Sequence, residues 1–516
     1  ENLTLKDGIN LKSRVWIPNK GGPWPALLMR QPYGKEIAST VTYPHPTWWA
    51  SNGFLVFIQD VRGQGSSEGT FNGFEQEACD TSQTHSWVRS FPECNGLLGT
   101  YGFSYQGITQ LLAEPGSQPP DCLAPAMTGL DESKHWSCDG NAYWWHLGLS
   151  WGLQLAALKA KREDKLEVWE KIRHSLENNS YLREGADLLE KHDPNGMANK
   201  WLKRSHGDIG EWTTYKPLRT WLKQPMMLIG GWWDPHLTGI LDIHNQSLKA
   251  GGSPELHIGP ATHLSWWEGI HNHQLEFFKK HLQDPQKTKK EAAKKLLWNL
   301  TTRKWQDLNS ASEDSPSWSL RSKGLACLNP TDGEILSDEA GEGIVNLVHD
   351  PWRPVNSIGG HLSPSQGEAD RKEIDLRLDV ATFISKQFKK SIQIQGKPLL
   401  ALIAKSDQKG FDLCVSLSII ENNQEKVKQL STGFLRLRGN SCKELVKRTV
   451  FFQPLLADFK EGDRLQISIA GSAWPAIGVN SGSKVHHCQA PSPHSLITTI
   501  TLVLDESKFQ IEPLFS

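Results

Sequence analysis

The stretch GLLGTYGFSYQGITQ, residues 96–110, decides how the rest of the sequence is interpreted. An apolar run leads through glycines to Ser104 and then into a second apolar run, which predicts a strand that turns sharply into a helix. A nucleophilic serine on such a turn typically has the spacing G-x-S-x-G. Gly102 fits this spacing, but the second glycine is Gly107 rather than residue 106. The motif alone therefore allows two interpretations, a nucleophile or a small residue in a glycine-rich loop.

Buried strands are predicted upstream of this turn. Residues 25–34 (PALLMRQPYG) and 54–65 (FLVFIQDVRGQG) are apolar runs that end in polar loops, and helical segments alternate with them. This alternation favours a largely parallel sheet with helices on both faces. Ligands of such sheets bind beyond the carboxyl ends of the strands. Tyr33, Asp60 and Ser104 each follow a predicted strand, so we expect them along one edge of the sheet.

The rest of the chain divides by its patterns into further parts. Residues 131–217 have helical periodicity and are expected to form a cap, inserted between the two parts of an α/β domain at 1–130 and 218–304. From residue 305 to 516, short alternating strands with turn residues predict an antiparallel β-sandwich, specifically a jelly roll. The predicted fold class is α/β, with an inserted helical cap and a C-terminal jelly-roll domain.

The composition excludes several classes of partner. The net charge is -1 over 516 residues, whereas nucleic acids and anionic membranes require a dense basic surface. The one basic run, at 287–295, is expected to be an exposed helix. No apolar stretch approaches the roughly 20 residues that span a bilayer, and the first residues resemble no secretion signal. The eight cysteines are scattered without a C-x-x-C pair, which favours reduced thiols in the cytoplasm and no metal site.

Two polar residues follow predicted strands downstream of the cap. Asp234 ends the strand in LIGGWWDPH, and His263 follows the next strand, in LHIGPATHLSWW. The order Ser, Asp, His on separate loops is that of a nucleophile, an orienting acid and a base. His263 would take the proton of Ser104 while Asp234 holds the other ring N–H. His236 is the competing base, but it lies only two residues after Asp234 and would not reach across from a separate loop.

An oxyanion that forms during attack by Ser104 needs hydrogen-bond donors already in place. The backbone N–H of Tyr105, the residue after the serine, is expected to be one donor. The hydroxyl of Tyr33, in the loop RQPYGK, is the candidate for the second donor. The alternative is that Tyr33 only packs beneath its loop. This set of residues requires no cofactor and no metal.

Tryptophan is unusually frequent in this chain, with 22 residues, several of them in adjacent pairs. Most are expected to pack in the core and between domains. Two pairs flank the acidic and histidine motifs, which suggests a pocket with aromatic walls. The candidate pocket tryptophans are Trp136, Trp144, Trp145, Trp233 and Trp266.

Taken together, these segments resemble one family of serine hydrolases, that of cocaine esterase and the X-Pro dipeptidyl-peptidases. GTYGFSYQG is similar to the family's G-x-S-Y-x-G motif, which has its glycine at the third position after the serine. RQPYGK resembles its oxyanion-tyrosine segment, DVRGQGSSEG its D-x-R-G loop, GGWWDPH its acid motif and IGPATH its histidine motif. NSIGG (356–360) and AGSAWPAIGVN (470–480) resemble segments of its C-terminal domain. The matches cover nearly the whole chain in order.

The resemblance implies an α/β-hydrolase domain, a helical cap and a jelly-roll domain, with the active site where they meet. Asp60 and Arg62 match the D-x-R loop, where a structural ion pair is expected. The remaining roles that it implies are Ser104 as nucleophile, Asp234 as acid, His263 as base, and the Tyr33 hydroxyl with the Tyr105 amide as oxyanion hole.

The substrate class is less directly implied. In the α-amino acid ester hydrolases of this family, two carboxylates lie two and three positions after the acid, where this sequence has His236 and Leu237. A desolvated ammonium group needs such partners, so we expect a small-molecule ester with a hydrophobic or aromatic acyl group. An X-Pro dipeptidyl-peptidase that binds a short peptide is the alternative, with Asp131, Glu132 and Asp139 as its ammonium site.

Two further alternatives remain at this stage. An acyltransferase would use the same triad, with an amine or alcohol in place of water at the second step. A catalytically dead hydrolase would act as a binding protein, its jelly roll recognising a carbohydrate or a partner. All five expected catalytic elements are present, which disfavours the dead enzyme. A homo-oligomer is compatible with the sequence.

Overall fold

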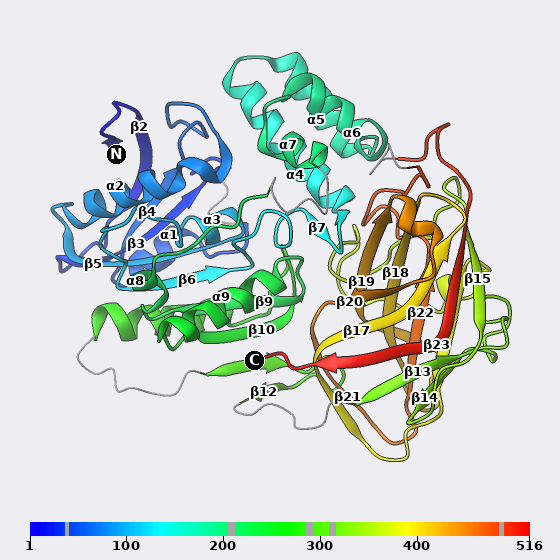
Figure 1. Cartoon of the computed structure of the whole chain (residues 1–516). Coiled ribbons are helices and arrows are strands. Elements are labelled where there is room, and N and C mark those ends of the chain that lie inside the picture. The colour runs from blue at the N-terminus through cyan, green and yellow to red at the C-terminus, as the bar shows by residue number, and fades with distance from the viewer. Residues whose placement is uncertain (37–40, 205–211, 285–293, 309–315, 484–489, 516) are drawn as a thin grey trace.

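The protein is described by a computed structural model that covers residues 1–36, 41–204, 212–284, 294–308, 316–483 and 490–515. Figure 1 shows three parts: an N-terminal sheet with its helices, a group of helices set beside it, and a strand-rich C-terminal part. Most of the basic run at 287–295, expected to be an exposed helix, lies outside the described residues. None of the seven cysteines within the described ranges forms a disulfide.

The N-terminal part contains a ten-stranded sheet with the order β1-β2-β4-β3-β5-β6-β9-β10-β11-β12. The strands from β4 to β11 in this order pair in parallel, as expected, and antiparallel strands lie at both edges. The strands are β1 (Asn2–Thr4), β2 (Asn10–Trp16), β3 (Trp24–Gln31), β4 (Leu55–Asp60), β5 (Cys94–Phe103), β6 (Cys122–Ala126), β9 (Met227–Trp233), β10 (Glu255–Thr262), β11 (Lys295–Trp298) and β12 (Trp305–Asp307).

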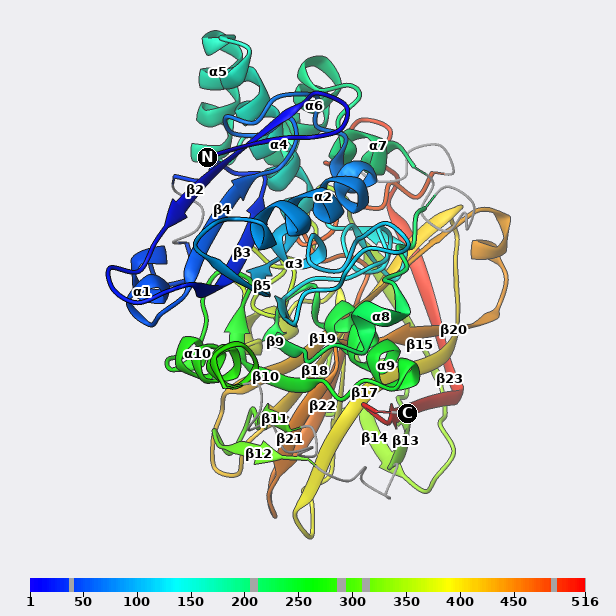
Figure 2. The same cartoon turned by 90° about the vertical axis from the view of Figure 1, so that its left-hand side faces the viewer.

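Helices cover this sheet, which explains why its central strands read as continuous apolar runs. Every residue of β4 and of β9 is buried. Figure 2 shows α2 (Glu77–Arg89), α9 (Leu237–Ala250) and α10 (Ile270–Phe278) packed around the strands. Strands β11 and β12 continue the sheet to Asp307, slightly past residue 304, where the sequence pattern puts the end of the domain.

The helical part lies between β6 and β9 in the chain, where the cap is expected. It begins with the hairpin β7 (Cys138–Asp139) and β8 (Ala142–Tyr143). The helices that follow are α4 (Trp145–Arg162), α5 (Leu166–Glu177), α6 (Tyr181–His192) and α7 (Met197–Lys203). Within the described ranges, every helix of the chain is too short or too polar to traverse a bilayer.

The C-terminal part is built on an 11-stranded sheet. Nine of its strands follow the order β19-β18-β22-β16-β14-β13-β23-β17-β20, and the other two lie off this path, β15 paired with β23 and β21 paired with β17. All of its pairings are antiparallel except that of β14 with β16. Its strands are β13 (Ser317–Arg321), β14 (Glu334–Ser337), β15 (Ile344–His349), β16 (Val380–Ser385), β17 (Ile392–Ser406), β18 (Gly410–Ile420), β19 (Val427–Arg438), β20 (Val446–Phe451), β21 (Leu455–Phe459), β22 (Arg464–Ala470) and β23 (Thr498–Glu512).

Hydrogen bonds tie the C-terminal part to the other two. The amides of Trp145 and His146, at the start of α4, donate to the carbonyl oxygens of Ala476 and Pro475 at 3.0 Å. The side-chain amide of Gln453 donates to the backbone carbonyl of Asp234 at 2.7 Å, and both side chains are buried. Such buried bonds fix the three parts relative to one another.

Candidate active site

Ser104 lies on the turn between β5 and α3 (Tyr105–Ile108), with φ 58° and ψ -126°. This conformation is strained for a residue with a side chain and recurs at functional sites. The amide of Ser104 donates to the carbonyl oxygens of Ala126 and Met127 at 3.0 and 3.1 Å, which holds the turn in place. A Cβ at Gly107 would lie 2.7 Å from Cβ of Thr128, so close packing requires the glycine at this position. Close packing against Thr128 therefore explains why a glycine stands three residues after Ser104.

Asp234 and His263 meet at the carboxyl ends of β9 and β10. Nδ1 of His263 lies 2.6 Å from Oδ2 of Asp234, whose side chain is fully buried. The other carboxylate oxygen of Asp234 accepts the backbone N–H of His236 at 2.9 Å. Because Nδ1 faces the carboxylate, the remaining ring nitrogen of His263 is left to act on a substrate or nucleophile.

The ring of His236, the competing base, is bonded to a backbone carbonyl and not to Asp234. Its Nδ1 lies 2.6 Å from the backbone oxygen of His135, and a carbonyl oxygen can only accept, so Nδ1 carries a proton. Burial is the main cause that lowers the pKa of His236 to about 3, which keeps the ring neutral. Its centre lies 5.0 Å from the ring centre of His263. The carboxylate of Asp234 thus bonds the ring of His263 and only the backbone of His236.

The loop after β3 carries Tyr33. Its backbone N–H donates to Oε1 of Gln31 at 2.8 Å, and the amide of Lys35 donates to Oδ1 of Asp60 at 2.6 Å. The hydroxyl of Tyr33 accepts the indole N–H of Trp151 at 3.0 Å, and the side chain of Ser104 lies close enough to lower the pKa of Tyr33. Burial raises the pKa of Tyr33 to about 12, so the hydroxyl keeps its proton. Among the described contacts, no direct hydrogen bond joins Ser104 to His263, and such contacts are often loose in free enzymes.

Asp60 and Arg62, expected to form an ion pair, have separate partners. Asp60 accepts from the amides of Lys35 and Ser66 and thereby holds the loop that carries Tyr33. Arg62 pairs with Asp80 of α2, with Nη2 and Oδ1 2.7 Å apart. The two side chains are therefore structural, as expected, but each stabilises a different neighbour.

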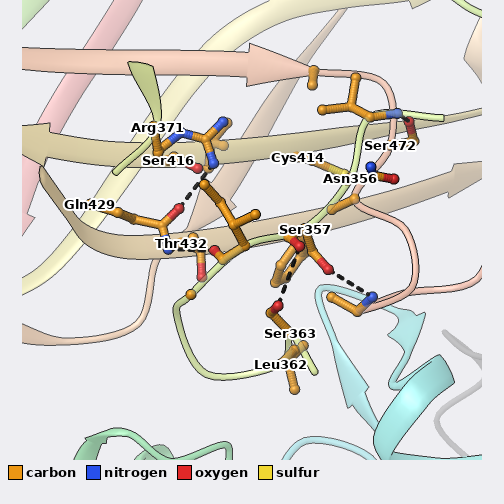
Figure 3. A pocket seen from close by; sticks show the side chains of 18 residues that line it. Asn356, Ser357, Leu362, Ser363, Arg371, Cys414, Ser416, Gln429, Thr432 and Ser472 are labelled. Atoms are coloured by element: carbon orange, nitrogen blue, oxygen red, sulfur yellow. Dashed lines mark hydrogen bonds between the residues drawn. The ribbon is translucent and has the colours of Figure 1, made fainter. Parts of the chain in front are cut away.

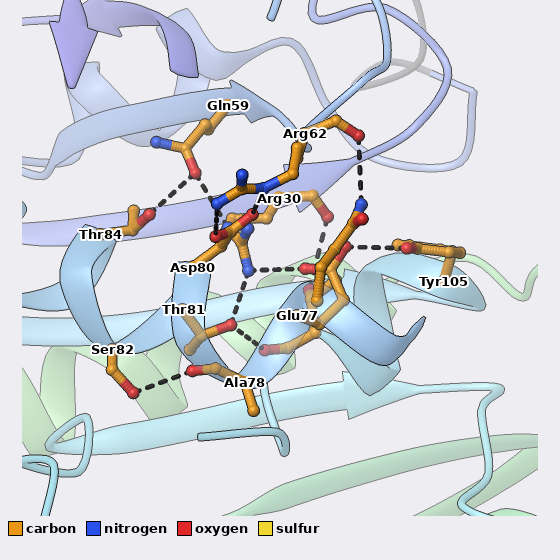
Figure 4. A network of polar contacts seen from close by, with 12 residues as sticks. Arg30, Gln59, Arg62, Glu77, Ala78, Asp80, Thr81, Ser82, Thr84 and Tyr105 are labelled. Atoms are coloured by element: carbon orange, nitrogen blue, oxygen red, sulfur yellow. Dashed lines mark hydrogen bonds and ion pairs between the residues drawn. The ribbon is translucent and has the colours of Figure 1, made fainter. Parts of the chain in front are cut away.

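The side chain of Tyr105 is anchored behind the turn (Figure 4). Its hydroxyl lies 2.8 Å from Oε1 of Glu77 and 2.8 Å from the carbonyl oxygen of Gly73. Glu77 in turn pairs with Arg30 of β3, with Oε2 and Nη1 2.8 Å apart and both side chains buried. Burial raises the pKa of Glu77, and the charge of Arg30 opposes this shift. The residue that follows Ser104 is thus held by a fully buried network.

A cavity of about 610 Å³ lies at the candidate site. Tyr33, Ser104 and His263 line it together. The rest of its wall is mostly apolar, and none of the described lining residues is a carboxylate or a cation. The apolar and aromatic residues of the wall are Val41, Phe103, Trp136, Trp144, Leu147, Trp151, Leu176, Pro235 and Leu264.

A second cavity lies within the C-terminal part (Figure 3), but it measures only about 30 Å³, room for about one water molecule. Its polar side chains bond neighbouring protein groups: Nη1 of Arg371 donates to Oε1 of Gln429 at 2.9 Å, and the hydroxyl of Ser363 donates to the carbonyl of Ser357 at 3.3 Å. This cavity cannot hold a substrate.

Comparison with known proteins agrees with this architecture. The model of the X-Pro dipeptidyl-peptidase (S15 family) matches residues 7–265, and that of the X-Pro dipeptidyl-peptidase C-terminal non-catalytic domain matches residues 278–510. The chain belongs to the S15 family. It is therefore a hydrolase, with an α/β-hydrolase-like N-terminal part and a separate strand-rich C-terminal domain.

Several relatives share the full length of this S15 chain. Cocaine esterase of Rhodococcus sp. (strain MB1 Bresler) is 23% identical over 530 residues, which cover 93% of this chain and 92% of that protein. The structure of an aminopeptidase from a marine sediment archaeon, Thaumarchaeota archaeon, has a TM-score of 0.73 at 16% identity and covers 100% of this chain and 96% of its own. An α-amino acid ester hydrolase has a TM-score of 0.71 at 17% identity, covering 99% and 95%. The two structures share the fold.

The tryptophans predicted for the pocket of this S15 chain divide into two groups. Trp136 and Trp144 line the cavity, whereas Trp145, Trp233 and Trp266 are not among its described lining residues. Trp145 points to α6, where its indole N–H donates to the carbonyl of Leu182 at 2.9 Å, and Trp233 is buried in a core cluster. Trp266 packs edge-on against Phe103, which itself lines the cavity. Their pocket assignment is corrected accordingly.

The three carboxylates considered for an ammonium site are engaged elsewhere. Asp131 accepts from the backbone amides of residues 133 and 134. Glu132 pairs with Arg204, with Oε2 and Nη1 2.7 Å apart, and Asp139 lies 2.9 Å from Nε2 of His361. None of them is among the described lining residues of the cavity. The described lining of this cavity therefore gives no support to the ammonium site suggested from sequence.

Most of the other lining residues were not predicted from sequence, and two of them contact the candidate site. Trp151 projects from α4 and bonds Tyr33, and His236 faces the cavity next to His263. Trp151 is separated from Tyr33 by 118 positions, so no local pattern marks their contact. His236 lies two residues after Asp234, but this spacing suggests a competing base and does not predict a position in the cavity wall.

Proposed function

We propose that this S15 chain is a serine hydrolase that cleaves an ester, or less readily an amide, through an acyl-enzyme. Ser104 is the nucleophile, His263 the base and Asp234 the orienting acid. The observation that carries the proposal is the convergence of separate loops on one cavity, where Ser104, His263 and Tyr33 share the wall and Asp234 bonds His263 at 2.6 Å.

The reaction follows from these positions. His263 takes the proton of Ser104 as its oxygen attacks the carbonyl carbon, and then returns the proton to the leaving group. Asp234 holds the opposite ring N–H and stabilises the imidazolium that forms. The hydroxyl of Tyr33 and the amide of Tyr105 donate to the oxyanion, where loss of one donor typically costs about 10²–10³-fold in kcat. Water then hydrolyses the acyl-enzyme by the same steps.

The substrate that fits best is a small ester with a hydrophobic or aromatic acyl group. Apolar and indole side chains make up most of the described cavity wall, and no carboxylate is present there to neutralise a substrate ammonium group. The cocaine esterase that is 23% identical to this chain supports an ester as the substrate class. An X-Pro dipeptidyl-peptidase is the second candidate because the family model bears that description. Acyl transfer remains an alternative outcome on the same triad.

The architecture proposed with this function is the one predicted from sequence. Residues 131–217 act as a cap, because α4 contributes Trp151 and Leu147 to the cavity wall. The C-terminal domain, from about residue 305, is proposed to be a jelly roll, since its pairings are almost all antiparallel. It supports the active site through Gln453 rather than by binding a ligand.

The test compares the wild type with Ser104→Ala on a p-nitrophenyl ester of a short or aromatic acid and on Gly-Pro p-nitroanilide. Ester turnover that falls by about 10⁶-fold in the variant supports the proposal. Anilide cleavage at a comparable rate would assign the chain to the X-Pro peptidases instead. A fluorophosphonate probe that labels neither protein, together with no turnover above the variant, would overturn it in favour of a binding protein.

A further inference from the structure

Trp151 makes a contact that the proposed triad does not use. It lies on α4 of the helical part and lines the cavity, and its indole N–H donates to the hydroxyl oxygen of Tyr33 at 3.0 Å. Trp136 is its neighbour, with ring centres 5.9 Å apart, but the N–H of Trp136 donates to the backbone oxygen of Gly129 at 2.8 Å. Of these two adjacent indoles, only Trp151 reaches Tyr33.

The contact with Trp151 restricts the direction in which the Tyr33 hydroxyl can donate its proton. An indole N–H can only donate, whereas a phenol has one proton to give and lone pairs that accept. The oxygen of Tyr33 must therefore accept from Trp151, and its own proton points away from the indole. The side chain of Ser104 lies close enough to lower the pKa of Tyr33, and both residues line the cavity. The O–H of Tyr33 is thus left to point toward the cavity that it shares with Ser104.

We propose that Trp151 is a positioning residue of the oxyanion hole, which fixes the direction of the Tyr33 O–H and polarises it. After attack, the oxyanion is bonded to the same carbon as the serine oxygen, in the cavity that Tyr33 and Ser104 both line, so a hydroxyl that faces this cavity needs little movement to stabilise the new charge. A donor already oriented avoids the cost of reorganisation during reaction. The inference rests on the proposed roles of Ser104 and Tyr33.

With this role for Trp151, the helical part contributes to rate enhancement as well as to substrate binding. Tyr33 belongs to the loop after β3, and Trp151 to α4. The proposed oxyanion hole therefore combines Tyr33 from the N-terminal part with Trp151 from the helical part. Its backbone donor, the amide of Tyr105, follows β5 in the N-terminal part.

The test is a double-mutant cycle with wild type, Trp151→Phe, Tyr33→Phe and the double variant. For each protein, kcat and KM are measured on a p-nitrophenyl ester, together with Ki of an arylboronic acid that forms a tetrahedral adduct with the serine. Trp151→Phe keeps an aromatic ring but loses the N–H. We expect kcat to fall about 10-fold, and boronate affinity to fall in parallel, with little change in KM.

In the Tyr33→Phe background, Trp151→Phe is expected to change kcat less than about 2-fold, because the two residues act as one unit. Trp136→Phe is the matched control: it removes an indole from the same wall without touching Tyr33 and should alter KM more than kcat. Trp151→His, which keeps a ring N–H, should recover part of the lost kcat and guards against loss of fold.

Equal losses of kcat from Trp151→Phe in both backgrounds would overturn the inference, since Trp151 would then act by packing alone. Failure of the proposed function gives a different result. In that case Ser104→Ala would keep its activity, or Tyr33→Phe alone would leave kcat unchanged.

Discussion

The hydroxyl of Tyr105 lies 2.8 Å from the carboxylate of Glu77, within a network in which Glu77 also pairs with Arg30. All three side chains are buried. The backbone N–H of Tyr105 follows the proposed nucleophile, so its side-chain anchor determines how firmly that N–H is held. In the proposed mechanism, Tyr105 therefore acts at two ends: its backbone N–H faces the substrate and its side chain is anchored in the core.

Tyr105→Phe tests this anchor, because it keeps the backbone N–H and the ring. We expect kcat to fall about 10-fold with little change in KM, since the amide would be less well oriented toward the oxyanion. Tyr215→Phe is the matched control, because its hydroxyl also bonds a buried carboxylate, Glu132, at 3.1 Å. If both variants lose similar stability and neither loses kcat, the anchor is only structural.

The strained turn at Ser104 makes a prediction about stability. With φ at 58°, Ser104→Gly should relieve strain that Ser104→Ala retains. We expect the glycine variant to have a free energy of unfolding about 1 kcal/mol above that of the alanine variant. Both variants should be inactive, so chemical denaturation of the two proteins measures strain separately from catalysis. Equal stabilities would mean that the turn costs nothing.

The buried histidines are expected to make the free energy of unfolding depend on pH. Burial, and then the charges of Arg30 and Arg89, lower the pKa of His85 from 6.5 to about 3. Between these values the unfolded chain binds a proton that the folded chain does not, so the free energy of unfolding falls as the pH falls below 6.5. The slope is about 1.4 kcal/mol per pH unit for one proton.

His85→Gln should therefore flatten the pH dependence of unfolding between pH 4 and pH 6 by about one proton. Urea denaturation at several pH values measures this slope. His236, whose pKa is also lowered to about 3, keeps its own contribution in the variant. An unchanged slope would show that His85 is not responsible for the difference in proton binding.

Gln453→Leu tests the link between the C-terminal domain and the acid loop. The variant leaves the backbone oxygen of Asp234 without the bond it accepts at 2.7 Å. An unpaired buried acceptor costs about 1–3 kcal/mol, so the midpoint of denaturation should fall. We also expect a lower kcat, because the loop that carries Asp234 is less firmly held. Gln393→Leu, at an exposed glutamine of the same domain, is the control.

Much of the N-terminal fold could be predicted from sequence because its signals are local. Apolar runs bounded by polar loops marked β3, β4, β9 and β10, and parallel pairing follows from alternation with helices. The expected positions of Tyr33, Asp234 and His263 after strands were confirmed in the structure. Their catalytic roles remain proposals.

The pocket was harder to predict because side-chain direction depends on tertiary packing. Trp144 and Trp145 are adjacent, yet Trp144 has a non-helical backbone before α4 and Trp145 is the first residue of the helix, so one faces the cavity and the other faces α6. Glu132 and Asp139 have partners at positions 204 and 361, far away in the chain. No spacing rule identifies such partners, and an unpartnered carboxylate in sequence is easily mistaken for a binding group.

Helix α4 lines the cavity and also carries the indole that bonds Tyr33. Under the proposed function, an exchange of this helix with that of a relative would change both the choice of acyl group and the speed of turnover. Natural variants that adapt to a new substrate through α4 must preserve the donor at position 151 or compensate for it. The proposed roles of α4 thus couple selectivity and catalytic efficiency in one element.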